Sequence, residues 1–374
     1  MQAEYTIWLC DQAGVHLALL DSYTTVDYTL LTNDVGILTI LLPGKAVPLS
    51  WIQPDGWIEV YRSAQGAQKQ LDGESVWLIQ TYGYVLNKGE LNIEILAEHA
   101  VTLLKRRIVP FDPTAAQATK TDFAGNIMKA IVRENLTAAT NTARNVSNVT
   151  VQADTGDGAS ITHSFAYLPL LQVAQEAAQS STTQGIRVYF DLVRPSEGQL
   201  EFRTYGGQRG IDHGRVNGGS IVTFAPEFGN LTDARRTWDY RTEATYIYAG
   251  GVGIGPSRDV QVAEDTTRSS RSPFGRREQF VTASNATDSS GGSNTAAVQA
   301  AANAALVPGR PLRRFVGSLV DTPNVARGVH WNWGDVVSVQ LRGETYDYRI
   351  EALRVRIQGG VETTEARLQS EDLI

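Results

Sequence analysis

The five histidines are the first residues to test for chemistry, because histidine is a common general base and a common metal ligand. They are His16, His99, His163, His213 and His330. No two of them stand at the short spacing of a helical metal-binding pair, so each is predicted to be structural or exposed. A Ser-His-Asp triad assembles in space and stays open, although no Gly-x-Ser-x-Gly motif is present.

Two short motifs resemble ligand-binding loops but lack residues that the chemistry needs. In Gly250–Pro256, a proline falls where a dinucleotide fingerprint needs glycine, and no helix pattern follows. Asp154–Gly158 resembles half of a calcium loop without the downstream bidentate carboxylate. Cys10, the single cysteine, excludes an internal disulfide and predicts no cysteine metal cluster. We therefore predict no catalytic residue, no cofactor-binding residue, no metal ligand and no cofactor.

Two other groups of residues could contact a partner. Arg268, Arg271, Arg276 and Arg277 form a local basic run, which in an acidic chain indicates a solvated loop more readily than a contact with an acidic partner. His330–Trp333 contains two tryptophans that could stack on a sugar ring. A tryptophan beside a strand start more often fills the open end of a barrel, so a glycan-binding receptor module is kept as an alternative function.

The composition is that of a globular protein. The chain has 374 residues, a net charge of −7 and 42 % hydrophobic residues, which suggests two to four domains of roughly 100–200 residues each. The acidic balance argues against a protein that coats nucleic acid. Met1–Tyr5 has no basic or apolar region typical of a signal peptide, and no apolar run approaches the roughly 18–20 residues of a membrane helix. We expect folding in a reducing cytosol, or in a particle assembled there.

The elements that must position these residues are mainly strands. Apolar and polar residues alternate through Trp333–Ser370, as half-buried antiparallel strands require. The phase changes at Ala352, which predicts a β-bulge. A similar pattern of strands and turns occupies Gly56–Leu96. The two stretches are either unrelated meanders or two copies of one β-domain.

Three regions follow from the pattern. Residues 1–109 are predicted to form a β-barrel closed by a helix at Glu98–Arg107, and Pro110–Pro113 marks a boundary. Residues 110–215 contain two helix patterns and a hairpin, which indicates a smaller α+β domain. Residues 216–374 are predicted to form a second barrel, with long polar loops at about 251–310 that are interrupted by strands at Arg258–Ala263 and Glu278–Thr282 and a helix at Ala296–Leu306. The predicted fold class is mainly β, with two barrels bracketing an α+β insert.

Several motifs resemble those of siphophage tail-tip hub proteins. Thr32–Ile40, followed by a proline, resembles the family's N-terminal signature, and Ala97–Val109 its helix after the first barrel. Phe228–Leu231 and Trp333–Val337 are similar to later signatures. Thr245 departs from the asparagine expected there. The spacing holds over essentially the whole chain, and the family is similar to the hub of contractile-phage baseplates and to the N-terminal part of tail-associated lysins.

The resemblance implies a non-enzymatic structural hub with two tail-tube-like barrels. Three copies would form a pseudo-six-fold ring that joins the six-fold tail tube to the three-fold tip around a DNA channel. The implied partners are two further copies of the chain, the distal tail protein ring, the C-terminus of the tape-measure protein, and tip fibre or receptor-binding proteins. DNA would pass through the lumen without specific binding. The implied location is the virion, at the tail tip, after assembly in the host cytoplasm.

A tail-associated cell-wall hydrolase is the second alternative, because related hubs carry a lytic domain as a C-terminal extension. This chain ends at Ile374, directly after the last predicted strand, which favours the structural hub over the hydrolase.

Overall fold

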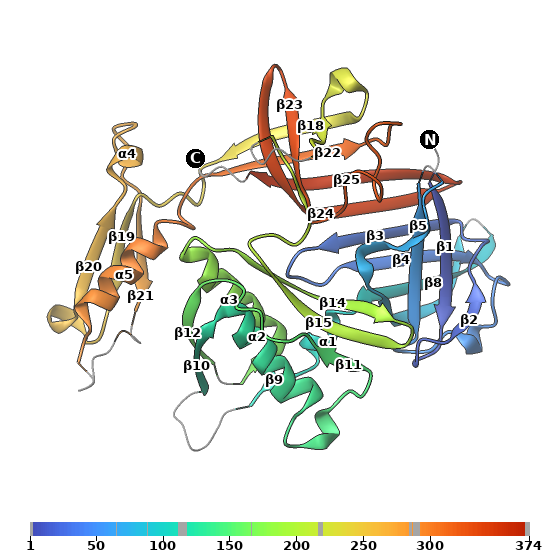
Figure 1. Ribbon diagram of the computed structural model, residues 1–374, viewed down its shortest axis with the longest axis horizontal. Coiled ribbons are helices and arrows are strands. Elements are labelled where there is room, and N and C mark those ends of the chain that lie inside the picture. The colour runs from blue at the N-terminus through green and yellow to red at the C-terminus, as the bar shows by residue number, and fades with distance from the viewer. Residues whose placement is uncertain are drawn as a thin grey trace. The chain divides into compact units, whose positions relative to one another are not determined.

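The computed structural model shows a mainly β protein with a few helices (Figure 1). It describes residues 3–64, 66–87, 89–110, 118–165, 167–215, 220–283, 286 and 292–370. The chain divides into two compact units, a larger one of residues 1–182, 186–235 and 315–369 and a smaller one built around residues 236–314. Within the described residues, none of the helices is long and apolar enough to cross a membrane.

The first β segment contains the seven strands that the alternation predicts. They are β1 (Glu4–Cys10), β2 (His16–Leu19), β3 (Thr25–Leu31), β4 (Ile37–Pro43), β5 (Trp57–Ser63), β7 (Trp77–Asn87) and β8 (Glu90–His99), with a short β6 (Gln70–Leu71) beside β5. The following helix, α1 (Thr102–Lys105), is shorter than predicted, because β8 continues to His99.

The closing β segment contains the predicted meander. Its strands are β16 (Asp212–His213), β17 (Thr223–Phe224), β18 (Leu231–Asp239), β22 (Leu312–Leu319), β23 (Val336–Leu341), β24 (Glu344–Gln358) and β25 (Val361–Ser370). The phase change at Ala352 marks the point where β24 exchanges partners. Residues 344–349 pair with β23, and residues 352–358 pair with β3. A strand that bends in this way can pair with one neighbouring strand before the bend and with another after it.

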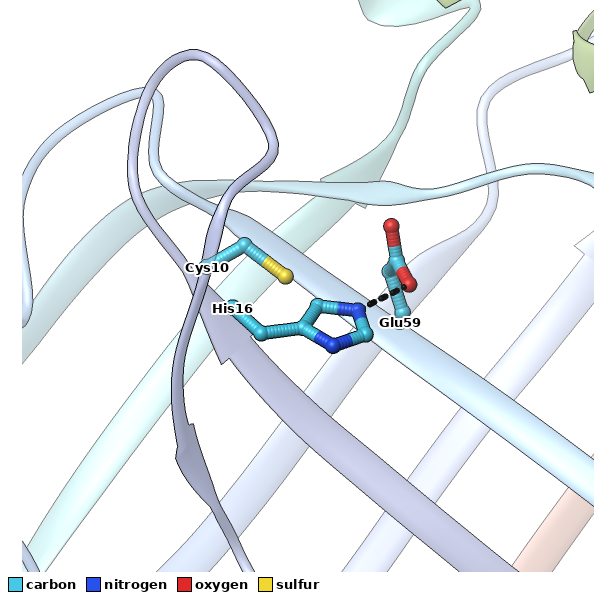
Figure 2. A group of neighbouring side chains, drawn as sticks. All are labelled: Cys10, His16 and Glu59. Carbon is cyan, nitrogen blue, oxygen red and sulfur yellow. Dashed lines mark hydrogen bonds and ion pairs between the residues drawn. The ribbon is translucent and has the colours of Figure 1, made fainter. Parts of the chain in front are cut away.

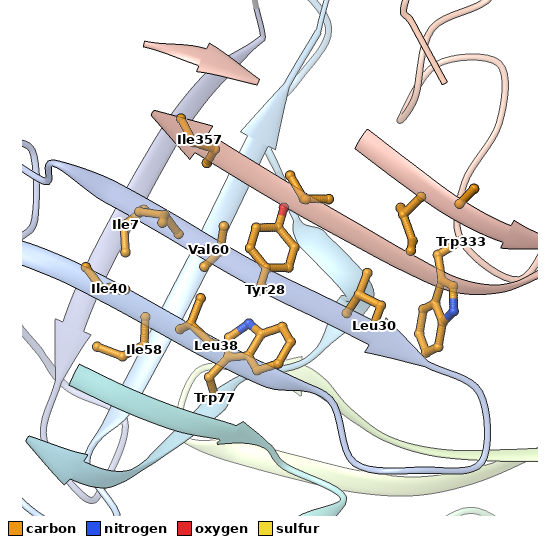
Figure 3. Close-up of a cluster of buried hydrophobic side chains, with 14 of the residues drawn as sticks. Ile7, Tyr28, Leu30, Leu38, Ile40, Ile58, Val60, Trp77, Trp333 and Ile357 are labelled. Atoms are coloured by element: carbon orange, nitrogen blue, oxygen red, sulfur yellow. The ribbon is translucent and has the colours of Figure 1, made fainter. Parts of the chain in front are cut away.

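The two β segments form one sheet. Its strand order is β18-β22-β25-β24-β3-β4-β8-β7-β5-β1-β2. The first and the closing β segment therefore meet where β24 pairs with β3. Both segments also share one hydrophobic core, in which Ile7, Tyr28 and Trp77 of the first segment lie with Trp333 and Ile357 of the second (Figure 3). The pairings trace an open path, so the closure of each segment into a separate barrel stays a prediction.

The middle region is α+β, as predicted. It contains β9 (Ile108–Val109), β10 (Ala118–Phe123), α2 (Ala124–Val132), β11 (Val149–Val151), β12 (Ser160–Phe165), β13 (Leu168–Pro169), α3 (Leu170–Thr183), β14 (Val188–Ser196) and β15 (Gln199–Gly206). Its core includes Cys10, Trp57 and Leu78 of the first β segment. The predicted boundaries at 109/110 and 215/216 adjoin 111–117 and 216–219, which lie outside the described residues, so the three-domain division stays a prediction.

The smaller unit contains the two strands and the helix that the sequence predicts between the polar loops of 251–310, and it adds the short helix α4 within a predicted loop. It contains β19 (Tyr246–Gly250), β20 (Val260–Glu264), α4 (Thr266–Ser269), β21 (Glu278–Thr282) and α5 (Thr295–Ala305). The strands form one sheet, and a core that includes Ile247 and Val298 lies between the sheet and α5. Residues 284–285 and 287–291 of the predicted loop lie outside the described residues.

Deleting residues 245–308 should leave the larger unit folded. The Ala244 N–H donates to the carbonyl oxygen of Gly309 at 2.8 Å, so the chain enters and leaves this part of the smaller unit at one place. Insertions with adjacent ends are tolerated because they leave the parent core intact. Urea unfolding of a chain in which two glycines join residues 244 and 309 should retain one cooperative transition. An aggregated chain without that transition would contradict the prediction.

The Gly36→Ala variant should lose about 1–3 kcal/mol of unfolding free energy, the usual cost of overpacking. A methyl group on Gly36 would lie 2.1 Å from the carbonyl oxygen of Thr29, and backbone cannot give way there without disturbing β3. Gly83→Ala is the matched control, because a Cβ on Gly83 meets no atom within 4 Å. Its unfolding free energy should change by less than about 0.5 kcal/mol in urea titrations. Equal losses in both variants would contradict the steric explanation.

Candidate functional site

Polar side chains in three of the motifs that carry the family resemblance bond to backbone groups. Asn33, in the first motif, has φ 55°, a left-handed conformation that asparagine tolerates better than most residues. Its side chain accepts a hydrogen bond from Phe190 N at 2.8 Å and donates to Val188 O at 3.1 Å. The amide therefore satisfies the backbone of β14 as a neighbouring strand would, and it joins the middle region to the first β segment.

Two other motifs act in the same way. Asn230 is buried, accepts from Ala225 N at 2.9 Å and donates to Thr223 O at 2.9 Å. Asp335 is buried and accepts from Ile211 N and Asn332 N, both at 2.6 Å. Each motif thus places a short polar side chain where a turn leaves backbone N–H groups without partners. Burial raises the pKa of the Asp335 carboxyl above its usual value.

The tryptophans at 331 and 333 are buried in the shared core, with 2 % and 4 % of their surfaces exposed. Trp331 packs edge-on against Phe224, and Trp333 is covered by the guanidinium of Arg209 at 3.9 Å from the ring centroid. Neither ring face is available to a sugar. The two tryptophans therefore fill the core, as the sequence favoured. Exposed tryptophans were the reason for considering a glycan-binding module, and these two are not exposed.

A network of buried charges joins the two β segments. Arg327, in the loop after β22, is 2 % exposed in its side chain. Its Nη1 donates to both carboxylate oxygens of Asp72, at 2.9 and 2.8 Å, and its Nη2 donates to Glu362 at 3.0 Å and to the Tyr5 hydroxyl at 2.9 Å. Asp72 and Tyr5 belong to the first segment, and Glu362 belongs to β25 of the second.

Arg62 extends this network from β5. Its Nη2 donates to Asp321 at 2.6 Å and to Glu362 at 2.9 Å, and its Nη1 donates to the carbonyl oxygen of Arg327 at 2.5 Å. Burial alone would raise the pKa of the Glu362 carboxyl. The two guanidinium groups outweigh this effect and lower that pKa to about 2. Glu362 is therefore ionised at neutral pH and holds both arginines.

A cavity of about 370 Å³ lies beside this network. Its lining includes Arg62, Arg327, Arg209, Tyr205 and Asp335. The charged groups around it already bond to one another, and they include no nucleophile held by a base. The charged groups of this lining therefore act as polar packing between the elements that they join.

A second buried ion pair, Asp191–Arg209, lies within the middle region and contacts both β segments, through His99 and Trp333. Asp191 on β14 accepts from Nη2 and Nε of Arg209 at 2.7 and 3.2 Å. The Nδ1 atom of His99 lies 3.8 Å from the same carboxylate, and its ring packs edge-on against Trp77. Burial lowers the pKa of His99, because a charged imidazole would lose its hydration there.

Residues from three neighbouring strands meet in the Cys10–His16–Glu59 cluster (Figure 2). One donor atom of each residue lies within 4.8 Å of the other two. His16 Nε2 lies 3.0 Å from Glu59 Oε2, and the fully buried carboxylate also forms an ion pair with Arg194 Nε at 2.8 Å. Burial and the nearby Glu59 raise the pKa of the Cys10 thiol. Sequence spacing missed this cluster, since 43 positions separate His16 from Glu59.

The other histidines have separate partners. His163 lies 3.6 Å from Glu176, His213 lies 3.5 Å from Asp335, and His330 Nδ1 accepts from Ala326 N at 3.0 Å. The structure brings none of these into a described triad with a serine.

The two loop motifs are turns with internal partners. Gly250–Pro256 connects β19 to β20, as predicted. In the predicted half calcium loop, Asp154 pairs with Arg133 at 2.5 Å, and Asp157 accepts from the Thr204 hydroxyl at 2.5 Å. These carboxylates are therefore committed to neighbouring side chains.

The arginine run is largely solvated, as its composition suggests, because Arg271, Arg276 and Arg277 are exposed. Arg268 is buried and donates to Asp265 at 2.7 Å and to the carbonyl oxygen of Gly309 at 2.9 Å. Arg276 donates to Glu278 at 2.7 Å and lies over a tyrosine ring. Arg277 pairs with Glu243 at 3.4 Å, so three of the four arginines bond within the smaller unit, whereas Arg271 is exposed.

Comparison with solved structures places this fold among phage tail proteins. The chain is similar to a tail protein from Neisseria meningitidis, with a TM-score of 0.62, 14 % identity and coverage of 99 % of this chain and 97 % of that one. A 43 kDa tail protein of prophage MuSo2 from Shewanella oneidensis matches with a TM-score of 0.59 and 11 % identity, over 98 % of each chain. Prophage tail protein gp18 from Listeria monocytogenes matches with a TM-score of 0.55 and 11 % identity, over 98 % of this chain and 95 % of that one.

The sequence defines the family more narrowly. Residues 5–368 match the family model of Siphovirus ReqiPepy6 Gp37-like proteins, and the chain belongs to this family. No curated protein matches the chain by sequence. The chain is thus a member of a siphovirus protein family, and its fold is similar to the folds of solved phage and prophage tail proteins.

Proposed function

We propose that the chain is the structural hub of a siphophage tail tip and acts as a homotrimer without enzymatic activity. Three copies would form a pseudo-six-fold ring around the DNA channel. The ring would join the six-fold tail tube and distal tail protein ring to the three-fold tip. Its further partners would be the tape-measure C-terminus inside and tip fibre or receptor-binding proteins below.

The observation that carries this proposal is the seam between the chain's two ends. Seven residues of β24, from Ala352 to Gln358, pair with Leu31 to Thr25 of β3. The seam is covered by a shared core and is linked by the arginines at 62 and 327. Two β segments of one chain are therefore held side by side as a rigid pair. Three such pairs supply six segments, which is the number needed to match a six-fold tube.

The net charge is compatible with this role. DNA is held by surfaces that neutralise its phosphates. A chain of net charge −7 offers no general excess of cations for that purpose, so DNA would pass through the ring without being retained.

The oligomeric state tests the proposal directly. Sedimentation and electron cryo-microscopy of the purified chain should give a particle of three times the 40.8 kDa chain mass, with three-fold symmetry and an axial opening. The first and closing β segments should alternate around that opening. A monomer at every concentration tested, or an assembly of another symmetry, would refute the hub proposal.

Peptidoglycan turbidity measured with the same preparation tests the non-enzymatic part. We expect no loss of turbidity above the buffer control. A loss that scales with protein concentration would instead support the cell-wall hydrolase.

A further inference from the structure

The Cys10–His16–Glu59 cluster contains the donor atoms of a transition-metal site. A thiolate, an imidazole and a carboxylate together suit Zn²⁺ and similar divalent ions. The donor atoms lie within 4.8 Å of one another, a separation that small side-chain rotations can reduce to the spacing around one ion. We propose that these three residues bind a zinc-like divalent cation, with a fourth position open to water.

Strand register explains why the three side chains share a face. Glu59 on β5 lies opposite Trp8 on β1, and Cys10 is two residues after Trp8. The side chains of Glu59 and Cys10 therefore point to the same side of the sheet. The β1–β2 register shifts between Leu9 and Cys10, and this shift places His16 opposite Cys10. Without this shift, the residue that follows His16 in the sequence would lie opposite Cys10. Bulges commonly re-aim side chains at binding sites in this way.

Neighbouring residues hold the donors in place. The ring of Trp8 stacks on the imidazole of His16, with centroids 4.4 Å apart and planes 6° from parallel. Arg194 Nε lies 2.8 Å from Glu59 Oε1, while the Tyr61 hydroxyl donates to Oε2 at 3.0 Å. Glu59 Oε2, which now meets His16, would bind the metal and leave Oε1 to Arg194. Such outer contacts orient ligands in established metal sites.

The cluster also has an entrance. The side chain of His16 is 34 % exposed, whereas Glu59 is fully buried and Cys10 is 1 % exposed. An ion could therefore reach the two buried donors, Cys10 and Glu59, past the exposed side of His16. Bound there, it would fasten β2, the last strand of the sheet order, to β1 and β5. This role is independent of the proposed hub function, because it concerns the rim of a single chain.

Cobalt binding to the full chain, purified without a polyhistidine tag, tests the site. Titration with Co²⁺ should produce a thiolate-to-cobalt charge-transfer band that saturates at one ion per chain, and Zn²⁺ should displace it. Cys10→Ser should abolish the band, and His16→Gln should weaken Co²⁺ binding at least tenfold. His163→Gln, which changes a histidine outside the cluster, should leave binding unchanged.

Each outcome decides the proposal. No charge-transfer band in the natural chain, or equal cobalt affinity in the natural and His16→Gln chains, would overturn it. His16 is exposed, so its replacement keeps the test valid even if Cys10→Ser fails to fold. Urea unfolding of the natural chain should also shift to higher denaturant with Zn²⁺ but not in the His16→Gln variant.

Discussion

Replacing Arg327 by methionine should lower the free energy of unfolding by about 3–5 kcal/mol, the usual cost of removing one partner from a buried ion network. The side chain is 2 % exposed and holds Asp72, Glu362 and Tyr5 together. Methionine fills much of the same volume but leaves Asp72 without the arginine that it binds and Glu362 with Arg62 alone. Equilibrium unfolding in urea, followed by tryptophan fluorescence, measures the loss.

Arg354→Met is the matched control for this variant. Arg354 pairs with Asp27 at 2.7 Å, but its side chain is 54 % exposed, and water screens the pair. Its loss should cost at most about 1 kcal/mol. Adding Asp72→Asn to Arg327→Met should recover part of the stability, because it removes an uncompensated buried charge. Equal effects of the two arginine variants would show that burial of the network has no energetic consequence.

Acid should weaken the same network through Glu362. The folded-state pKa of this carboxyl is lowered to about 2 from an ordinary value of 4.5. A group with a depressed folded pKa contributes its full stability above the unfolded pKa and loses it as pH falls towards the folded pKa. The stabilisation should therefore be complete above about pH 5 and should decline between about pH 4.5 and pH 2. A pKa shift of this size corresponds to about 3 kcal/mol of unfolding free energy.

The Glu362→Gln variant isolates this effect from other carboxyls. Unfolding free energies of the natural and variant chains, measured in urea from pH 2.5 to pH 6, should differ most at pH 6 and converge as pH falls. Glutamine keeps the shape of the side chain but does not titrate. A difference that is constant across this range would mean that Glu362 does not change its charge there.

Local pattern determined the strands and the helices of this protein. The alternation in residues 1–97 and in Trp333–Ser370 predicted strands that the structure confirms, because one buried face requires a period of two. The phase change at Ala352 was also visible, although its role as the exchange of partners by β24 was not. Within 251–310 the sequence also predicted two short strands and an alanine-rich helix, where the structure has β20, β21 and α5.

The motifs of the family were also visible in the sequence, but what they do was not. Asn33 and Asp335 looked like turn residues, and the structure shows their side chains satisfying backbone groups of distant segments. Turn chemistry is local, whereas the identity of the satisfied N–H group depends on which segment packs there.

Only the tertiary structure decided the contacts between the two ends of the chain. Arg62 and Glu362 lie 300 positions apart, and each sits in a strand where a charged residue normally faces water. Cys10, His16 and Glu59 likewise become neighbours only after β1 has paired with β2 and β5. Periodicity reports whether a face is buried, and it carries no information on which strand lies beside it. Strand pairing supplies that information, and it created both the buried charge network and the proposed metal site.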